Sequence, residues 1–168
     1  MRDSRSCSMG SIIDLPTALR IRADAKKRGL KVVFTNGCFD ILHRGHIEYL
    51  NEAKRLGDIL IVGLNSDSSV RDLKGEGRPL QGEEDRAIIL SNLCSVDYVV
   101  IFDESTPQRL IGELVPDVLV KGGDYSVEEI VGRETVWEAD GKVVVVRQRE
   151  GYSTSGLIAR IRSGTCES

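Results

Sequence analysis

Short apolar runs alternate with amphipathic segments along most of the chain. Residues 58–65 (DILIVGLN) are almost continuously hydrophobic, a pattern typical of a strand buried on both faces of a parallel sheet. Similar strand-sized runs recur at intervals that leave room for a helix between them. The pattern predicts five strands, over 31–36, 58–65, 96–102, 117–121 and 142–146.

Start and stop signals for helices fill the intervals between these strands. Asp14 precedes a helical segment with Pro16 in its first turn, and Thr106 precedes Pro107 in the same way, which are signals for a helix N-terminus. Within 44–56, Ile47, Leu50 and Ala53 are spaced to form one inward face. Helices are predicted over 14–28, 44–56, 66–73, 83–93, 106–115 and 126–139, with a last helix from Ser153 or Thr154 to about 162.

Strand–helix alternation of this kind predicts an α/β domain whose parallel sheet has right-handed crossovers. The polar segment 1–11 is interpreted as a disordered tail, and 12–168 as a single domain. In such sheets ligands bind outside the carboxyl ends of the strands. The loops after Asn36, Asn65, Lys121 and Val146 are therefore expected to form the functional edge.

Composition excludes several classes of partner. The chain has 168 residues and a formal net charge of −3, with a pI near 5.5, whereas nucleic-acid-binding domains usually have a pI above about 9. No apolar run approaches the roughly 18 residues that a membrane span needs. The N-terminus lacks the apolar stretch of a secretory signal. The four cysteines form no CxxC pair, which favours reduced thiols and a cytoplasmic protein; Cys94, in an apolar stretch, is interpreted as a core residue.

The segment 35–46 (TNGCFDILHRGH) carries the clearest chemistry. It follows the first strand, and Gly37 allows backbone amides to approach a ligand closely. The start of the following helix suits phosphate because of its free N–H groups and its dipole. His43 and His46 are the only two histidines, and one helical turn aims both the same way. They can donate hydrogen bonds to phosphate oxygens and stabilise charge on a phosphorus centre.

Other interpretations of these residues stay open. The histidine pair could belong to a zinc site completed by Cys38 or Asp40, although zinc sites use three or four protein ligands. The segment matches neither the Walker A loop nor the dinucleotide motif GxGxxG. By residue type alone, Lys74 is equally an ordinary loop lysine and Arg86 a partner of Glu83 or Asp85. Asp124 is equally a turn residue, Tyr125 a packing residue, Lys121 a surface strand end and Ser153–Ser155 a plain helix cap.

The run TNGCFDILHRGH resembles the HxGH motif of the nucleotidyltransferases related to glycerol-3-phosphate cytidylyltransferase. The resemblance extends to 73–75 (LKG), 84–86 (EDR), 116–125 (PDVLVKGGDY) and 150–155 (EGYSTS), and so covers about residues 30–162. The last two segments are most similar to the branch of D-glycero-β-D-manno-heptose 1-phosphate adenylyltransferases. One departure concerns an arginine of the family, whose position holds Gln148, between Arg147 and Arg149.

The resemblance implies a Rossmann-like three-layer sandwich around the five-stranded sheet, and a site for ATP. It implies catalytic roles for His43, His46, Lys74 and Arg86, the last two offsetting charge on the attacking and leaving groups. It implies that Mg²⁺ bridges phosphate oxygens with Asp40 as its nearest protein neighbour. The residues expected to bind the nucleotide are Thr35, Asn36, Gly37, Cys38, Phe39, Asp40, Lys121, Gly123, Asp124, Tyr125, Ser153, Thr154 and Ser155.

The reaction implied is attack of a sugar 1-phosphate on the α-phosphorus of ATP, which yields ADP-heptose and pyrophosphate. The family also implies a homodimer, and a chain this short implies a separate sugar kinase that supplies the substrate. Two further hypotheses remain: a cytidylyltransferase for a polyol phosphate such as glycerol 3-phosphate, and a nucleotide-binding regulatory module without catalysis. Retention of both histidines and of the Ser/Thr segment argues against the regulatory module.

Overall fold

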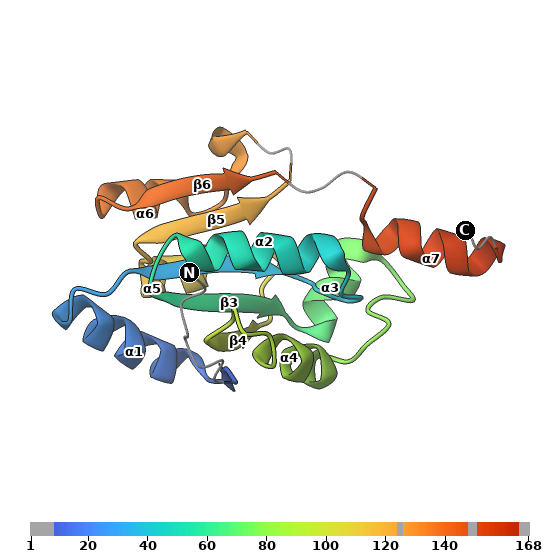
Figure 1. The fold of residues 1–168 in the computed structure, drawn as a ribbon, viewed down its shortest axis with the longest axis horizontal. Coiled ribbons are helices and arrows are strands. Elements are labelled where there is room, and N and C mark those ends of the chain that lie inside the picture. The colour runs from blue at the N-terminus through green and yellow to red at the C-terminus, as the bar shows by residue number, and fades with distance from the viewer. Residues whose placement is uncertain (1–8, 124–125, 148–150, 165–168) are drawn as a thin grey trace, which may run out of the picture.

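The computed structural model describes residues 9–123, 126–147 and 151–164. They form one parallel sheet between two layers of helices (Figure 1), with strand order β1-β4-β3-β2-β5-β6. The predicted Rossmann-like three-layer sandwich is thereby confirmed. The strands are β1 (Ser11–Ile12), β2 (Val32–Gly37), β3 (Ile59–Asn65), β4 (Tyr98–Phe102), β5 (Val118–Gly122) and β6 (Lys142–Val146).

Seven α-helices and one 3₁₀ helix connect the strands within the described part of the chain. They are α1 (Leu15–Lys27), α2 (Arg44–Arg55), α3 (Asp67–Lys74), α4 (Glu83–Ser91), α5 (Gln108–Leu114), η1 (Val127–Glu129), α6 (Arg133–Glu138) and α7 (Thr154–Ser163). The predicted caps hold at two of them, since Asp14 accepts from Thr17 N at 2.9 Å and Ser153 accepts from Gly156 N at 3.0 Å.

Each face of the sheet has its own apolar core. On one face α2 and α4 cover the strands with residues such as Leu50 and Leu90, which are fully buried. On the other face α1, α5 and α6 do the same with residues such as Ala18, Ile111 and Val136. The continuous apolar runs read from the sequence therefore serve two cores at once, which explains why they do not alternate.

The sheet has six strands, so the prediction of five strands is wrong by one. The additional strand, β1, pairs with β4 through Ser11–Tyr98 and Ile12–Val99. Gly10 packs closely here, because an added Cβ would lie 2.4 Å from Val96 O. A two-residue strand has no periodicity, and its first residue, Ser11, falls within the predicted tail 1–11. Residues 1–8 lie outside the described part, so a disordered tail and the single-domain boundaries stay predictions.

Two further expectations differ from the structure. The helix expected over 126–139 is divided into η1 and α6, because Gly132 between them has a φ of 85°. Cys94 is exposed in the turn after α4 and is disulfide-bonded, so both its assignment to the core and the expectation of a reduced thiol are wrong. Cys38 is a free thiol. In the described residues, no helix combines the length and apolar character needed to cross a membrane.

The connections place the functional edge at the middle of the sheet. From β2 the chain proceeds through β3 to β4 on one side, and then crosses to β5 and β6 on the other side of β2. The order therefore reverses between β2 and β5, and the carboxyl ends of these two strands are the expected position of a ligand.

Candidate active site

A cavity of about 550 Å³ opens at this edge, between the loops that follow the strands and the start of α7. Its volume lies within the roughly 300–1,000 Å³ that small-molecule sites occupy. Most of the predicted site residues line it together, although they come from four separate segments of the chain. These are Asn36, Gly37, Cys38, Phe39, Asp40, His43, His46, Lys74, Lys121, Ser153, Thr154 and Ser155.

The two histidines meet at the first turn of α2. Their rings are stacked, with centroids 3.8 Å apart and planes inclined by 18°. His43 is the N-cap residue and makes no side-chain cap hydrogen bond. The Nδ1 atoms of both rings are buried and have no hydrogen-bond partner within the described structure. Two stacked imidazoles at an uncapped helix start can hydrogen-bond a ligand that enters the cavity.

Small and aromatic neighbours fix the position of this pair. A Cβ at Gly45 would lie 3.1 Å from His43 Nδ1 and 3.3 Å from the Cβ of Tyr152. The glycine within HxGH therefore leaves the space in which the His43 ring and Tyr152 sit. On the other side, the ring centroid of Phe39 lies 5.2 Å from that of His46.

Burial keeps both imidazoles neutral at pH 7. Desolvation, with a smaller contribution from the adjacent His43, lowers the pKa of His46 to about 4. Desolvation also lowers the pKa of His43. A neutral pair can offer N–H donors to a ligand, without imidazolium charge.

Positive charge in the cavity comes instead from two lysines, and from Arg78, which is paired with Asp40. Lys121, at the end of β5, donates to Asn36 Oδ1 at 3.1 Å, and burial lowers the pKa of its ammonium group. Lys74, the last residue of α3, is exposed and lines the opening. Both ammonium groups are available to anionic oxygens at this edge.

The start of α7 supplies a second helix N-terminus. Thr154 Oγ1 donates to Ile41 O at 3.3 Å, which ties α7 to the loop before α2. Ser153, Thr154 and Ser155 all line the cavity. Two helix starts therefore face the same cavity from different parts of the chain.

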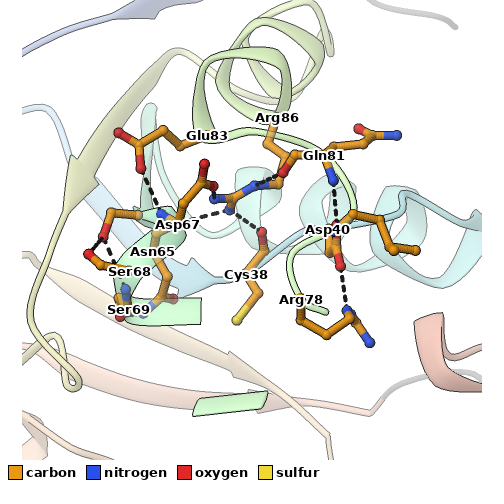
Figure 2. Close-up of polar contacts among 12 residues, drawn as sticks. Cys38, Asp40, Asn65, Asp67, Ser68, Ser69, Arg78, Gln81, Glu83 and Arg86 are labelled. Atoms are coloured by element: carbon orange, nitrogen blue, oxygen red, sulfur yellow. Dashed lines mark hydrogen bonds and ion pairs between the residues drawn. The ribbon is translucent and has the colours of Figure 1, made fainter. Parts of the chain in front are cut away.

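Asp40 lines the cavity but its carboxylate is already engaged. It accepts from Arg78 Nε at 2.6 Å and from the backbone N–H groups of Leu80 and Gln81 at 2.7 and 3.1 Å (Figure 2). The side chain is almost completely buried. Asp40 therefore does not fit a direct Mg²⁺ ligand, and across the described residues no three His, Cys, Asp or Glu side chains gather as a metal site.

Among the described residues, three of the predicted ones do not line the cavity: Arg86, Thr35 and Gly123. Arg86 is buried beneath it, where its guanidinium donates to oxygens of four different residues (Figure 2). The hydroxyl of Thr35 is hydrogen-bonded to that of Tyr49, which in turn reaches Val120 O at 3.2 Å. The structure gives Arg86 and Thr35 protein contacts that shape the site, and their expected contacts with the substrate stay predictions.

The glycine-rich loop after β5 is described only in part. Gly122 lines the cavity, while Gly123 lies beside it and donates from its N–H to Val146 O at 3.1 Å. Asp124 and Tyr125 lie outside the described residues, as do Gln148 and Arg149. The roles expected for Asp124 and Tyr125 stay predictions.

Sequence reasoning missed one wall of the cavity. Residues 105–107, after β4, and 129–131, at the end of η1, line it together with Asn65 and Tyr152. The Thr106–Pro107 pair was interpreted only as a helix start, although its place after a parallel strand also puts it on the functional edge. Residues 129–131 carry no motif that could have identified them.

Comparisons with known proteins identify the family of this chain. The model of the cytidylyltransferase-like family matches residues 34–160. "Bifunctional protein HldE" of Photorhabdus laumondii is 58% identical over 140 residues, which is 83% of this chain and 30% of that protein. The protein of the same name from Citrifermentans bemidjiense is 60% identical over 136 residues, 81% of this chain and 28% of that protein. The chain thus spans less than a third of the length of these relatives.

Two solved structures share the fold. A lipopolysaccharide core biosynthesis protein from Thermoplasma volcanium is 33% identical with a TM-score of 0.60, and the match covers 74% of this chain and all of that one. A pantoate-beta-alanine ligase from Francisella tularensis has a TM-score of 0.61 at 16% identity, with 86% of this chain and 69% of that one covered. The second likeness concerns the fold alone.

Proposed function

The chain belongs to the cytidylyltransferase-like family, and from that membership we propose that it is a nucleotidyltransferase that makes a nucleoside diphosphate sugar. The proposed reaction transfers AMP from ATP to D-glycero-β-D-manno-heptose 1-phosphate and releases pyrophosphate. The observation that carries the proposal is the stacked, neutral His43–His46 pair at an uncapped helix start inside the cavity.

The chemistry needs positioning more than it needs a base. A phosphate monoester has its second pKa near 6, so the attacking sugar phosphate is already ionised at neutral pH. Catalysis then consists of aligning its oxygen with the α-phosphorus of ATP and stabilising the charge that develops there. The site offers donors and cations for both tasks and does not require proton transfer.

The described residues divide these tasks between two sides of the cavity. The N–H groups of His43 and His46, with the first turn of α2, donate to the α-phosphate and strengthen these bonds as charge builds. Ser153, Thr154 and Ser155 hold the outer phosphates at the start of α7. Lys74 and Lys121 offset the charge of the attacking and leaving groups.

In this proposal Mg²⁺ binds together with ATP. The oxygens of Asp40 are engaged by Arg78 and by two backbone amides. Mg²⁺ commonly keeps several waters and takes few protein ligands beside phosphates. We therefore assign the ion to phosphate oxygens and water, without a direct bond to Asp40.

The choice of sugar phosphate rests on two supports. The sequence resembles heptose 1-phosphate adenylyltransferases through PDVLVKGGDY and EGYSTS, and the 33%-identical structure is a lipopolysaccharide core biosynthesis protein. An upstream kinase that forms the sugar 1-phosphate, a homodimer and a cytoplasmic location belong to the proposal on the resemblance alone.

The test measures pyrophosphate release by the purified chain with each nucleoside triphosphate and a panel of sugar and polyol phosphates. We expect turnover with ATP and heptose 1-phosphate, and none with CTP and glycerol 3-phosphate. Turnover with the second pair alone would contradict the proposed substrates while leaving the reaction type intact. No turnover with any pair would contradict the enzyme itself.

A further inference from the structure

Arg86 is the most completely enclosed charged residue of the site. Its guanidinium is buried, and its N–H groups donate to four different residues (Figure 2). Nη1 donates to Cys38 O at 2.6 Å and to Asn65 O at 2.8 Å. Nε donates to Gln81 O at 3.0 Å, and Nη2 to Asp67 Oδ1 at 2.7 Å. Four of its five N–H groups are engaged, so little donor capacity remains for a ligand.

Asp40 makes a matching set of contacts on the other side of the same loop. Its carboxylate holds Arg78, and it accepts from the N–H of Gln81 at 3.1 Å. The C=O of Gln81 in turn accepts from Arg86. The loop between α3 and α4 is therefore fastened twice to the loop after β2, once through Arg86 and once through Asp40.

Both fastening points flank Phe39. Cys38, whose carbonyl binds Arg86, precedes it, and Asp40 follows it. Phe39 has a φ of 45°, in the left-handed region that costs energy for a bulky residue. Its ring lies 5.2 Å from the ring of His46. The contacts of Cys38 and Asp40 hold Phe39 in place from both sides. Phe39 in turn forms the wall against which the ring of His46 packs.

We propose that Arg86 and Asp40 are positioning residues that clamp the loop after β2 and set the place of His46 through Phe39. The catalytic consequence rests on the proposed function, whereas the structural one does not. A lysine at position 86 keeps the charge but cannot reach four oxygens, because only a planar guanidinium fork spans them. Charge at position 86 is therefore not sufficient for activity.

The matched control lies at the opposite edge of the sheet. Arg22 also forms a partly buried ion pair, with Asp117 at 2.8 Å, and donates from Nε to Val115 O at 2.9 Å. It lines no described part of the cavity. Arg22→Lys thus removes comparable contacts without touching the clamp.

The two histidines of the chain provide a direct readout. In Arg86→Lys we expect the NMR signals of both imidazoles to shift at pH 7, and the titration midpoint of His46 to rise from about 4 toward the ordinary 6.5. In Arg22→Lys we expect both signals and the midpoint to stay as in the parent protein. Unmoved imidazole signals in a folded Arg86→Lys protein would overturn the proposal.

Kinetics add a second, separable readout. Where the parent protein turns over ATP, we expect Arg86→Lys to lower kcat by about tenfold to a hundredfold, with KM for ATP changed less than kcat. A KM increase with an unchanged kcat would overturn the positioning role. If no nucleotide is turned over, the proposed function is contradicted. The NMR measurement still tests whether Arg86 sets the position of His46.

A milder variant covers the case in which Arg86→Lys does not fold. Asp67→Asn keeps the shape of the side chain but removes the charge opposite Arg86. We expect a smaller shift of the imidazole signals in the same direction. An Asp67→Asn protein with parental imidazole signals would then overturn the proposal.

Discussion

The helices α2 and α7 both begin at the cavity, but the protein holds them in different ways. α2 lies along the sheet and buries Tyr49, Leu50 and Ala53 in the core (Figure 1). α7 projects beyond the edge of the sheet in the same view, and none of its residues is buried. One helix is fixed along its length, and the other is held at its first turn.

At their N-termini the order is reversed: the buried helix lacks a side-chain cap, and the exposed helix has one. The first turn of α2 has no side-chain cap, whereas Ser153 caps α7. A helix that its core already stabilises does not depend on a cap, which is worth about 1 kcal/mol, so its amides can serve a ligand. Under the proposed function, we expect α2 to set the geometry of the reaction and α7 to contribute affinity for the outer phosphates.

Replacing His46 by alanine should have the largest effect on the rate, because it removes a donor from the start of α2. We expect kcat to fall about 10²–10³-fold, because a donor aimed at the developing charge is lost from a rigid wall. The rate of pyrophosphate release measures the loss, and circular dichroism checks that the variant folds. A rate equal to that of the parent protein would remove His46 from the mechanism.

Replacing Gly45 by alanine tests the rigidity of the same wall. The added methyl group meets His43 and Tyr152, so the imidazole has to move and kcat should fall by about tenfold. Gly112→Ala is the matched control, because Gly112 lies in α5 with nothing within 4 Å of an added Cβ. That control should gain about 0.5–1 kcal/mol in stability and keep its rate. Equal rates in both variants would contradict the tight fit at Gly45.

Lowering the pH should affect the start of α2 and not that of α7, because the two imidazoles lie at the start of α2. The pKa of His46 is lowered to about 4 from the ordinary 6.5, so the unfolded chain binds a proton between these values while the folded protein does not. The free energy of unfolding should therefore fall as the pH drops from about 6.5 to about 4. Denaturation in urea at several pH values measures this slope.

His46→Gln is the control for the acid experiment, since it removes the group and should flatten the slope. Ser153→Ala should leave the slope unchanged, because no proton binds there. An identical slope in His46→Gln and the parent protein would mean that His46 is not the group responsible.

Removing the cap of α7 should have the smallest effect. We expect Ser153→Ala to raise KM for ATP by a few fold through a looser helix start, with little change in kcat. Because α7 buries nothing, the midpoint of global unfolding should hardly move. Asp14→Ala is the comparison, since Asp14 caps α1, which packs in the core, so its loss should lower the midpoint of global unfolding. A large loss of kcat in Ser153→Ala would place α7 in the rigid wall with α2.

Local signals in the sequence predict most of the elements and the central motif. Caps such as Asp14 and Ser153, the apolar runs of β3 and β6, and the HxGH spacing each depend on residues within one or two turns. Their neighbours are known from the sequence, so the structure reproduces them. The sequence does not predict β1, because a two-residue strand shows no hydrophobic periodicity.

The contacts of long or buried polar side chains were determined by the tertiary structure alone. Arg86 was expected at the phosphates, but packing brings Cys38 and Asn65 to its guanidinium. Asp40 is expected beside Mg²⁺, and the structure shows that its carboxylate also holds Arg78, a contact that no local motif indicates. Likewise, the lowered pKa of the histidines arises from burial, which no spacing reveals. The sequence by itself determined where chemistry-bearing residues lie along the chain; which of them contact a ligand and which hold the others depends on long-range packing, which brings together segments distant in the sequence.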